Sequence, residues 1–334
     1  EPSAALSPRE TKGLFRVIDE LKSNSIGIIY ISHRLDEIFE VADRVTILRD
    51  GEHIDTRPIT SLTREKMIEL MVGRSLEKEF PKHEATLGQA RFEVTNLRRG
   101  SRVRGVSFNI RAGEVLGLTG LVGAGRTETA RLLFGADRPE HGVIRLDGKP
   151  LKIKSPRDAI RQGICLLTED RKTHGLVLGQ TARENFGLPN LSQFASLGFI
   201  RQREESREFL RYVDQIQIKI ADPEQITGTL SGGNQQKVVL AKWLQRNAEV
   251  IIFDEPTRGI DVGAKYEIYQ LINQLAEQGK AILMISSELP EILGVSDRVL
   301  VMNEGHITGE ITDIANATQE DIMKLATKRE TLAA

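Results

Sequence analysis

The sequence predicts an α/β fold with a largely parallel sheet, and two observations support this. Short runs that are apolar at nearly every position alternate with longer amphipathic segments of helical spacing. Strands that are covered on both faces need such continuous apolar runs, whereas strands with one exposed face alternate apolar and polar residues. The clearest runs lie at residues 115–118, 164–167, 250–253 and 281–285. Their alternation with helical segments is typical of a sheet with helices on its faces.

The composition is that of a globular chain. Its 334 residues are 40% hydrophobic, which is enough for two packed domains. Lys and Arg number 46 against 47 Asp and Glu, so there is no overall basic excess to indicate nucleic acid as a partner. No apolar stretch approaches the roughly 20 residues of a membrane-spanning helix. The single cysteine, Cys165, lies in an apolar run and is expected to be a small buried residue.

Several segments recur within the chain at a constant offset. The residues Glu-Pro-Ser at 1–3 return as Glu-Pro-Thr at 255–257, segment 29–33 returns at 283–287, and Asp-Arg-Val at 43–45 returns at 297–299. The offset is 254 each time (255 minus 1, 287 minus 33, 297 minus 43). Because chance similarity would drift, we interpret the offset as a gene duplication.

The repeat also predicts the domain organisation. We expect residues 1–72 to be the C-terminal remnant of a first copy, 73–89 a linker, 90–327 a nearly whole second copy and 328–334 a tail. The front of the first copy would precede residue 1. A polar stretch rich in Arg and Glu, from about Pro189 to Asp222, predicts a helical subdomain inserted into the second copy.

A glycine-rich segment follows the strand at 115–118 and precedes a helical segment. It reads Gly120-Leu-Val-Gly123-Ala-Gly125-Arg126-Thr127. Glycines let successive backbone N–H groups point at phosphate oxygens, and the start of a helix adds its positive dipole end. Alone, such a segment can be a plain turn, but its strand-to-helix context favours a phosphate loop with Arg126 in the usual lysine position. Thr127 would offer its hydroxyl to Mg²⁺.

Two carboxylates follow the strand at 250–253. Asp254 and Glu255 are expected at the carboxyl edge of the sheet, where ligands of open α/β sheets bind. Asp254 would hold Mg²⁺, and Glu255 would orient and deprotonate an attacking water.

A third motif opens a later helix. Leu-Ser-Gly-Gly at 230–233 precedes Asn-Gln-Gln-Lys and an apolar helical stripe. Ser231 is a natural N-cap, and the two glycines at the helix start form a second anion site. Two such sites in one module favour two modules that close on one ATP between them.

Together these motifs resemble the ATP-binding cassette ATPases, and the resemblance covers nearly the whole chain. It implies a P-loop fold with a parallel core sheet, an antiparallel β subdomain and a helical subdomain. More narrowly, the chain resembles the second half of tandem ATPases from monosaccharide importers of the ribose, galactose, xylose and arabinose type. That resemblance implies ATP and Mg²⁺ as cofactors, two membrane permease subunits and a periplasmic sugar-binding protein as partners, no nucleic acid, and attachment to the cytoplasmic side of a bacterial inner membrane.

The resemblance also assigns the site residues. Catalytic roles fall on Glu255, Glu1 and His33, and Mg²⁺ would be held by Thr127 and Asp254. The nucleotide-binding residues would be Gly120, Gly123, Gly125, Arg126, Thr127, Glu128, Glu169, Ser231, Gly232, Gly233 and Gln235.

Several positions depart from the family pattern. Arg126 replaces lysine, Glu169 replaces the usual glutamine, and Ser287 stands where the first copy has His33. We therefore hypothesise one hydrolytic composite site, with Glu1, His33 and the signature of the second copy, and one site that mainly binds. The chain by itself is expected to hydrolyse ATP weakly or not at all.

Three other functions remain open from the sequence. A soluble tandem ATPase that acts on ribosomes or nucleic acid would be expected to have a long basic linker and two intact sites. A non-catalytic nucleotide sensor fits Arg126 and Ser287 but not Asp254 and Glu255. An importer of nucleosides or of a signalling molecule would share all the motifs, because solute specificity resides in other chains.

Overall fold

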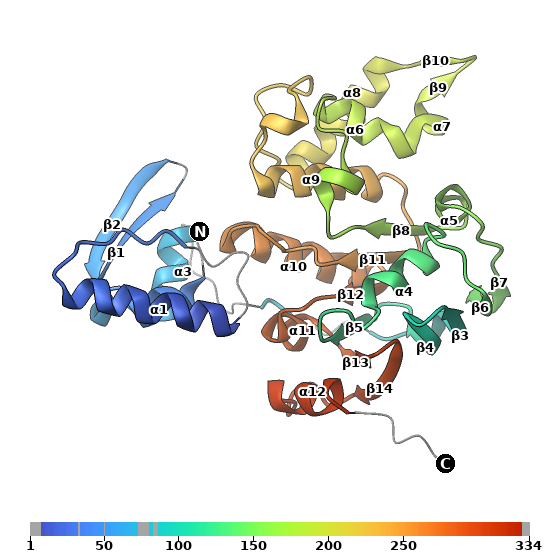
Figure 1. Ribbon diagram of the computed structural model, residues 1–334. Coiled ribbons are helices and arrows are strands. Elements are labelled where there is room, and N and C mark those ends of the chain that lie inside the picture. Colours follow the sequence, from blue (N-terminus) through green and yellow to red (C-terminus); the bar gives the residue numbers. More distant parts are fainter. Residues whose placement is uncertain (1–7, 33, 50, 73–79, 83–85, 329–334) are drawn as a thin grey trace. The chain divides into compact units, whose positions relative to one another are not determined.

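The computed structural model describes residues 8–32, 34–49, 51–72, 80–82 and 86–328 (Figure 1). The chain divides into two compact units. One comprises residues 1–79 with 259–266, and the other comprises residues 80–258 with 267–334. Each is described by itself.

The described part of residues 1–79 in the first unit forms three helices and a hairpin. The helices are α1 (Pro8–Ser23), α2 (Leu35–Val41) and α3 (Arg64–Val72), with a 3-10 turn η1 (Ile59–Ser61) before α3. Strands β1 (Arg44–Arg49) and β2 (Glu52–Pro58) pair antiparallel. Apolar side chains from α2, β1 and α3, among them Leu35, Ile47 and Met67, form a small core.

The second unit is organised around a six-stranded sheet with the order β14-β13-β5-β12-β11-β8. All neighbouring pairs are parallel except β13 and β14, so the predicted parallel core sheet is confirmed. Every residue of β8, β11 and β12 is buried, as expected for strands covered on both faces. The strands are β5 (Val115–Gly120), β8 (Ile164–Leu167), β11 (Val250–Asp254), β12 (Ala281–Ile285), β13 (Arg298–Asn303) and β14 (His306–Ile311).

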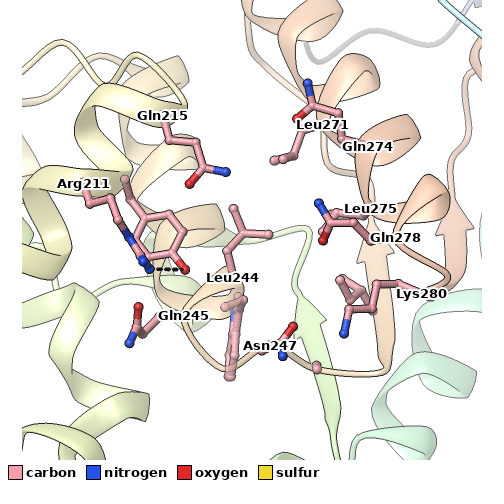
Figure 2. Close-up of a pocket in the computed structure, with 14 residues that line it drawn as sticks. Arg211, Gln215, Leu244, Gln245, Asn247, Leu271, Gln274, Leu275, Gln278 and Lys280 are labelled. Atoms are coloured by element: carbon pink, nitrogen blue, oxygen red, sulfur yellow. Dashed lines mark hydrogen bonds between the residues drawn. The ribbon is translucent and has the colours of Figure 1, made fainter.

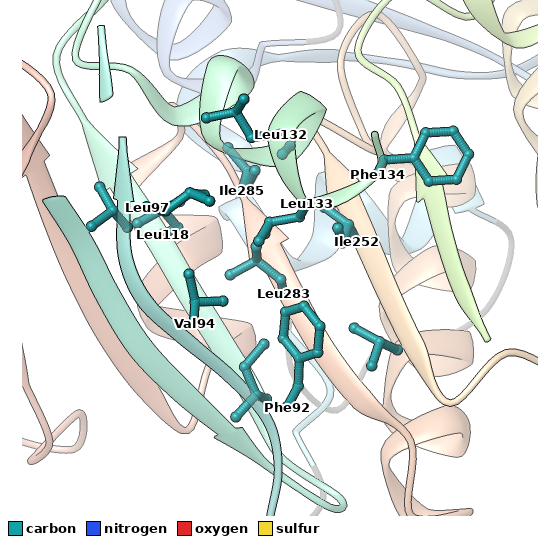
Figure 3. Packing of buried hydrophobic residues seen from close by; sticks show 14 of the residues in the cluster. Phe92, Val94, Leu97, Leu118, Leu132, Leu133, Phe134, Ile252, Leu283 and Ile285 are labelled. Atoms are coloured by element: carbon teal, nitrogen blue, oxygen red, sulfur yellow. The ribbon is translucent and has the colours of Figure 1, made fainter. Parts of the chain in front are cut away.

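A separate antiparallel sheet with the order β4-β3-β6-β7 lies beside the core sheet. Its strands are β3 (Ala90–Arg99), β4 (Val103–Arg111), β6 (His141–Leu146) and β7 (Lys149–Pro150). Helix α4 (Arg126–Leu133) packs its apolar face into the core between the two sheets. Figure 3 shows Leu133 of this helix next to Leu283 of the core sheet, which also lies next to Phe92 of the antiparallel sheet, while Leu132 lies nearer to Ile285. The helix that starts at the phosphate loop is thereby held in the main core.

The helical subdomain begins earlier than predicted. Helix α6 (Ala182–Gly187) starts seven residues before Pro189 (189 minus 182), because the Thr181 side chain caps it and Glu184 completes a capping box. The Phe186 ring contacts Phe194, Phe209 and Tyr212, with centroid distances of 5.3–5.9 Å. The subdomain further contains η3 (Leu188–Asn190), α7 (Leu191–Phe194), the hairpin β9 (Ala195–Ser196) and β10 (Phe199–Ile200), α8 (Gln202–Gln215), η4 (Thr227–Thr229) and α9 (Gly232–Leu244).

The remaining elements complete the unit. They are α5 (Pro156–Arg161), the π-helical turn η2 (Arg171–Gly175), α10 (Val262–Glu277, of which residues 262–266 belong to the first unit), α11 (Leu289–Val295) and α12 (Gln319–Ala326). Trp243, near the end of α9, meets Phe134, the C-cap of α4, edge to face at a centroid distance of 5.8 Å. The predicted burial of Cys165 is also found, and that burial raises the pKa of its thiol to about 12.

Candidate nucleotide site

The glycine loop connects the end of β5 to the start of α4, as the sequence predicts. Gly120 has φ +152°, and a Cβ there would lie 2.2 Å from the Met302 carbonyl oxygen. Gly125 has φ +102°, and a Cβ there would lie 2.2 Å from the Arg102 carbonyl oxygen. Both positions therefore require glycine, and Gly123, at φ +82°, adds a third left-handed residue.

The loop leads directly into the helix start. Gly125 is the N-cap of α4, and Glu128 lies in its first turn, half-buried. The first N–H groups of a helix have no intrahelical partner, so they are available to an anion held by the loop.

Asp254 lies at the carboxyl end of β11 and is 2% exposed. Burial is the main cause that raises its pKa to about 7, and the nearby Glu169 and Glu255 add to the rise. A hydrogen bond with Thr127 and the charge of Arg126 act in the opposite direction. Among the described residues, nothing donates a hydrogen bond to its buried Oδ1 atom. Thr127 and Asp254, the two predicted metal ligands, are thus brought together.

Glu255 follows Asp254 in a strained conformation. Its φ is +50°, a left-handed value that costs a non-glycine residue roughly 1–2 kcal/mol. Its backbone N–H donates to the Ile285 carbonyl at 2.9 Å. The side chain accepts from Ser287 Oγ at 3.1 Å and lies 3.5 Å from Arg126 Nη1. The carboxylate is therefore held between a hydroxyl group and a guanidinium group.

Glu169 lies at another edge of the site. It follows β8, the strand next to β11, and its carboxylate lies 3.6 Å from Nη1 of Arg258. Its charge contributes to the raised pKa of Asp254. The structure thus gathers the phosphate loop, Asp254, Glu255 and Glu169 into one site.

The signature segment lies apart from this site. Ser231 is the N-cap of α9, with Gly232 and Gly233 in the first turn. Gln235 is buried, and its amide donates to the Thr227 and Leu230 carbonyls, both at 3.2 Å. Figure 1 shows α9 and α4 in different parts of the second unit. The predicted residues Glu1 and His33 lie outside the described residues.

The sequence reasoning missed two features near the site. One is the contact between Arg126 and Glu255, which only the fold brings about. The other is Glu291, a buried carboxylate in the first turn of α11. The constant offset of 254 could have drawn attention to it, because the same offset relates Glu291 to Glu37.

A cavity of about 300 Å³ lies elsewhere, between α8, the end of α9 and α10 (Figure 2). Asn247 and Lys280 line it and precede β11 and β12, so it adjoins the amino ends of these strands. Asp254 lies at the opposite, carboxyl end of β11. Amide side chains, including Gln215, Gln274 and Gln278, dominate its rim. It is therefore distinct from the nucleotide site.

None of the described helices combines the length and the apolar character that a membrane-spanning helix needs.

A parallel sheet with a glycine loop after one strand and two carboxylates after another defines a P-loop nucleotide-binding domain. Comparisons with known proteins support this class of domain. The ABC transporter family model matches residues 103–258. Two solved structures share the fold: an ATP-binding cassette in its ADP conformation (TM-score 0.60, 20% identity, 71% of this chain and 98% of that one) and a dimeric cassette with ADP and Pi (0.57, 22%, 66% and 98%).

Curated relatives match nearly the whole chain. A putative ribose/galactose/methyl galactoside import ATP-binding protein of Rhizobium etli is 53% identical over 98% of this chain, and the ribose import ATP-binding protein RbsA of Bacillus subtilis is 50% identical over 98%. The chain spans 62% and 66% of their respective lengths. The chain therefore carries an ATPase domain of the ABC transporter family.

Proposed function

We propose that this chain belongs to an ATP-binding subunit that hydrolyses ATP to energise the import of a simple sugar. The observation that carries the proposal is the buried Asp254 beside Thr127 at the end of the phosphate loop, with Glu255 next to it. This arrangement supplies a phosphate cradle, a cation site and a candidate base at one sheet edge.

Mg²⁺ fits the chemistry of this donor set. The Oδ1 atom of Asp254 is buried and accepts no hydrogen bond within the described part of the chain, and oxygen ligands are those that Mg²⁺ prefers. Thr127 and Asp254 would hold the cation. When bound, it neutralises charge on the phosphate oxygens. The amides of the glycine loop and Arg126 would bind the phosphates, and Glu255 would orient water and accept its proton.

We further propose that this site mainly binds nucleotide. Arg126 Nη1 lies 3.5 Å from the Glu255 carboxylate, so the group that would orient the water is already engaged by a guanidinium group. Ser287 occupies the place of the histidine found in the first copy. The hydrolytic site would then be the one that combines Glu1 and His33 with Ser231, Gly232 and Gly233.

The relatives' names support the transport role, since the proteins described above are import ATP-binding proteins for ribose or galactose. By analogy, the partners would be two permease subunits and, through them, a periplasmic sugar-binding protein, at the cytoplasmic side of a bacterial inner membrane. A tandem ATPase that acts on ribosomes or nucleic acid is not favoured, because no such protein is among these relatives and the net charge is -1.

Titration calorimetry with Mg-ATP tests the proposal. The purified chain should bind Mg-ATP, and Arg126→Ala should weaken binding by about ten-fold or more, the usual effect of losing a contact between charged groups. Arg203→Ala, at an exposed arginine of α8, serves as the matched control and should bind as the unmodified chain does. A chain that binds no nucleotide would contradict the proposed role of this site.

A further inference from the structure

Glu291 forms a buried junction beneath the nucleotide site. Its side chain, on the first turn of α11, is 1% exposed. One carboxylate oxygen accepts a hydrogen bond from Thr257 Oγ1 at 2.5 Å, and the other accepts from Ser286 Oγ. Both hydroxyl-bearing residues are also buried, so the three groups form a polar cluster inside the protein.

The two hydroxyl groups belong to the segments that carry the reactive side chains. Thr257 lies two residues after Glu255, beyond the end of β11. Ser286 follows β12 and directly precedes Ser287, whose Oγ donates to Glu255 at 3.1 Å. A single carboxylate thus ties together the two loops that hold Glu255 and its partner.

Neighbouring groups fix the junction further. Ser286 Oγ accepts a hydrogen bond from the Glu288 backbone N–H at 3.0 Å, which orients the hydroxyl toward Glu291. Tyr269 of α10 also hydrogen-bonds Glu291. Burial raises the pKa of Tyr269 above its ordinary value, and the charge of Glu291 adds to the rise. The phenol therefore stays protonated and acts as a donor.

The first unit contains a related contact between a buried glutamate and a serine. Glu37, 254 positions before Glu291, is buried and accepts from Ser32 Oγ at 3.1 Å and from the Tyr30 hydroxyl at 2.8 Å. Ser32 precedes Ser286 by the same 254 positions. The carboxylate–serine contact is thus present twice, whereas the aromatic donor comes from a different position each time. The contact that recurs is the one between the glutamate and the serine five residues before it in the sequence.

We propose that Glu291 is a positioning residue. It holds the segments after β11 and β12 in place around the terminal phosphate of a bound nucleoside triphosphate. This rests on the proposed function, in which Glu255, the hydrogen-bond acceptor of Ser287, orients the water that attacks that phosphate. The hydrogen bonds of Glu291 described above go to the segments after β11 and β12, whereas the glycine loop, which would hold the inner phosphates, follows β5. Glu291 should therefore govern the preference for ATP over ADP and leave ADP affinity unaffected.

Calorimetry with Mg-ATP and Mg-ADP separates this role from a purely structural one. Thr257→Val and Ser286→Ala each remove one hydroxyl group from the junction at nearly constant volume. Each should weaken Mg-ATP binding by about five- to ten-fold, the usual effect of losing one hydrogen bond, and change Mg-ADP binding by less than about two-fold. Glu291→Gln, which keeps the shape, should give the same direction of change.

Thr308→Val is the matched control. Its hydroxyl donates to the Val301 and Leu325 carbonyls, away from the junction, so its loss should leave the ATP-to-ADP ratio unchanged. An unchanged ratio in both junction variants, or an equal loss of both nucleotides, would overturn the role of Glu291. So would an unmodified chain that binds ATP and ADP equally. A chain that binds neither nucleotide would instead overturn the proposed function itself.

Discussion

The charge of the Asp254 carboxyl group depends strongly on its burial in the fold. An unfolded aspartate has a pKa of about 4, whereas burial raises the pKa of Asp254 to about 7. Between these values the folded protein holds a proton that the unfolded chain has lost. The stability that this proton provides is complete below about pH 4 and is lost as the pH rises through 7.

Asp254→Asn should therefore change the pH dependence of stability. The amide stays neutral, so without Mg²⁺ the variant should melt at least about 3 °C above the unmodified protein at pH 8, with a smaller difference at pH 5. Thermal melts across this range measure the difference. Asp214→Asn, at an exposed position of α8, should show no such trend. A difference that is constant with pH would mean that Asp254 does not titrate in this window.

The left-handed backbone of Glu255 determines the relative stability of two variants at this position. Glu255→Ala and Glu255→Gly both remove the carboxylate, but only alanine retains the steric cost of φ +50°. The glycine variant should be the more stable by about 1 kcal/mol in chemical denaturation. The reverse order would indicate that the backbone at residue 255 relaxes to negative φ once the side chain is removed.

At the scale of the elements, the contact between α6 and α8 leaves no space for an added side chain. A Cβ on Gly187 would lie 1.7 Å from Glu205 Oε1 and 2.8 Å from its carboxyl carbon. Glu205 cannot move away easily, because it is buried and paired with Arg183. The glycine at the end of α6 is therefore fixed by packing.

Gly187→Ala should destabilise the protein by about 1–3 kcal/mol, the usual cost of overpacking. Urea denaturation measures this. Gly179→Ala is the matched control, since no atom lies within 4 Å of a Cβ added there, and its effect should stay within about 0.5 kcal/mol. Equal stability of both variants would show that α6 and α8 separate readily.

The predicted and observed elements agree for the core sheet and differ for the start of the helical subdomain. The strands of the core sheet follow from their apolar runs, because burial on both faces imposes a pattern that a single sequence displays. The helical subdomain starts at α6, ahead of the polar stretch from about Pro189 that predicts it, since the signal for α6 is the short box from Thr181 to Glu184 and not an apolar period. The junction at Glu291 joins α11 to the segments after β11 and β12, and only the folded chain shows such pairings.

In the whole molecule, ATP turnover is limited by the number of phosphate loops and signature segments that one chain contains. The 334 residues contain one phosphate loop and one signature segment, and these lie apart within the second unit. If each ATP needs the loop of one module and the signature of another, one copy of the chain completes neither site. The expectation of weak turnover follows from this count.

Phosphate release by the purified chain should therefore stay well below the roughly 1 s⁻¹ at the low end of typical enzymes. Glu255→Gln controls for contaminating ATPases. Steady turnover that is lost in this variant would contradict the expectation, because two copies of the second unit would then have to pair. In a longer protein that includes the first module, Glu1→Gln should abolish turnover, whereas Glu255→Gln should largely preserve it.

Trp243 provides an optical probe of the domain. It is the only tryptophan in the sequence, and its indole ring meets Phe134 at 5.8 Å and the Lys242 ammonium at 5.3 Å. Phe134 ends the helix that begins at the phosphate loop, whereas Trp243 lies on the helix that begins at the signature segment. Tryptophan emission therefore reports, without any added label, on the alignment of these two helices when nucleotide arrives.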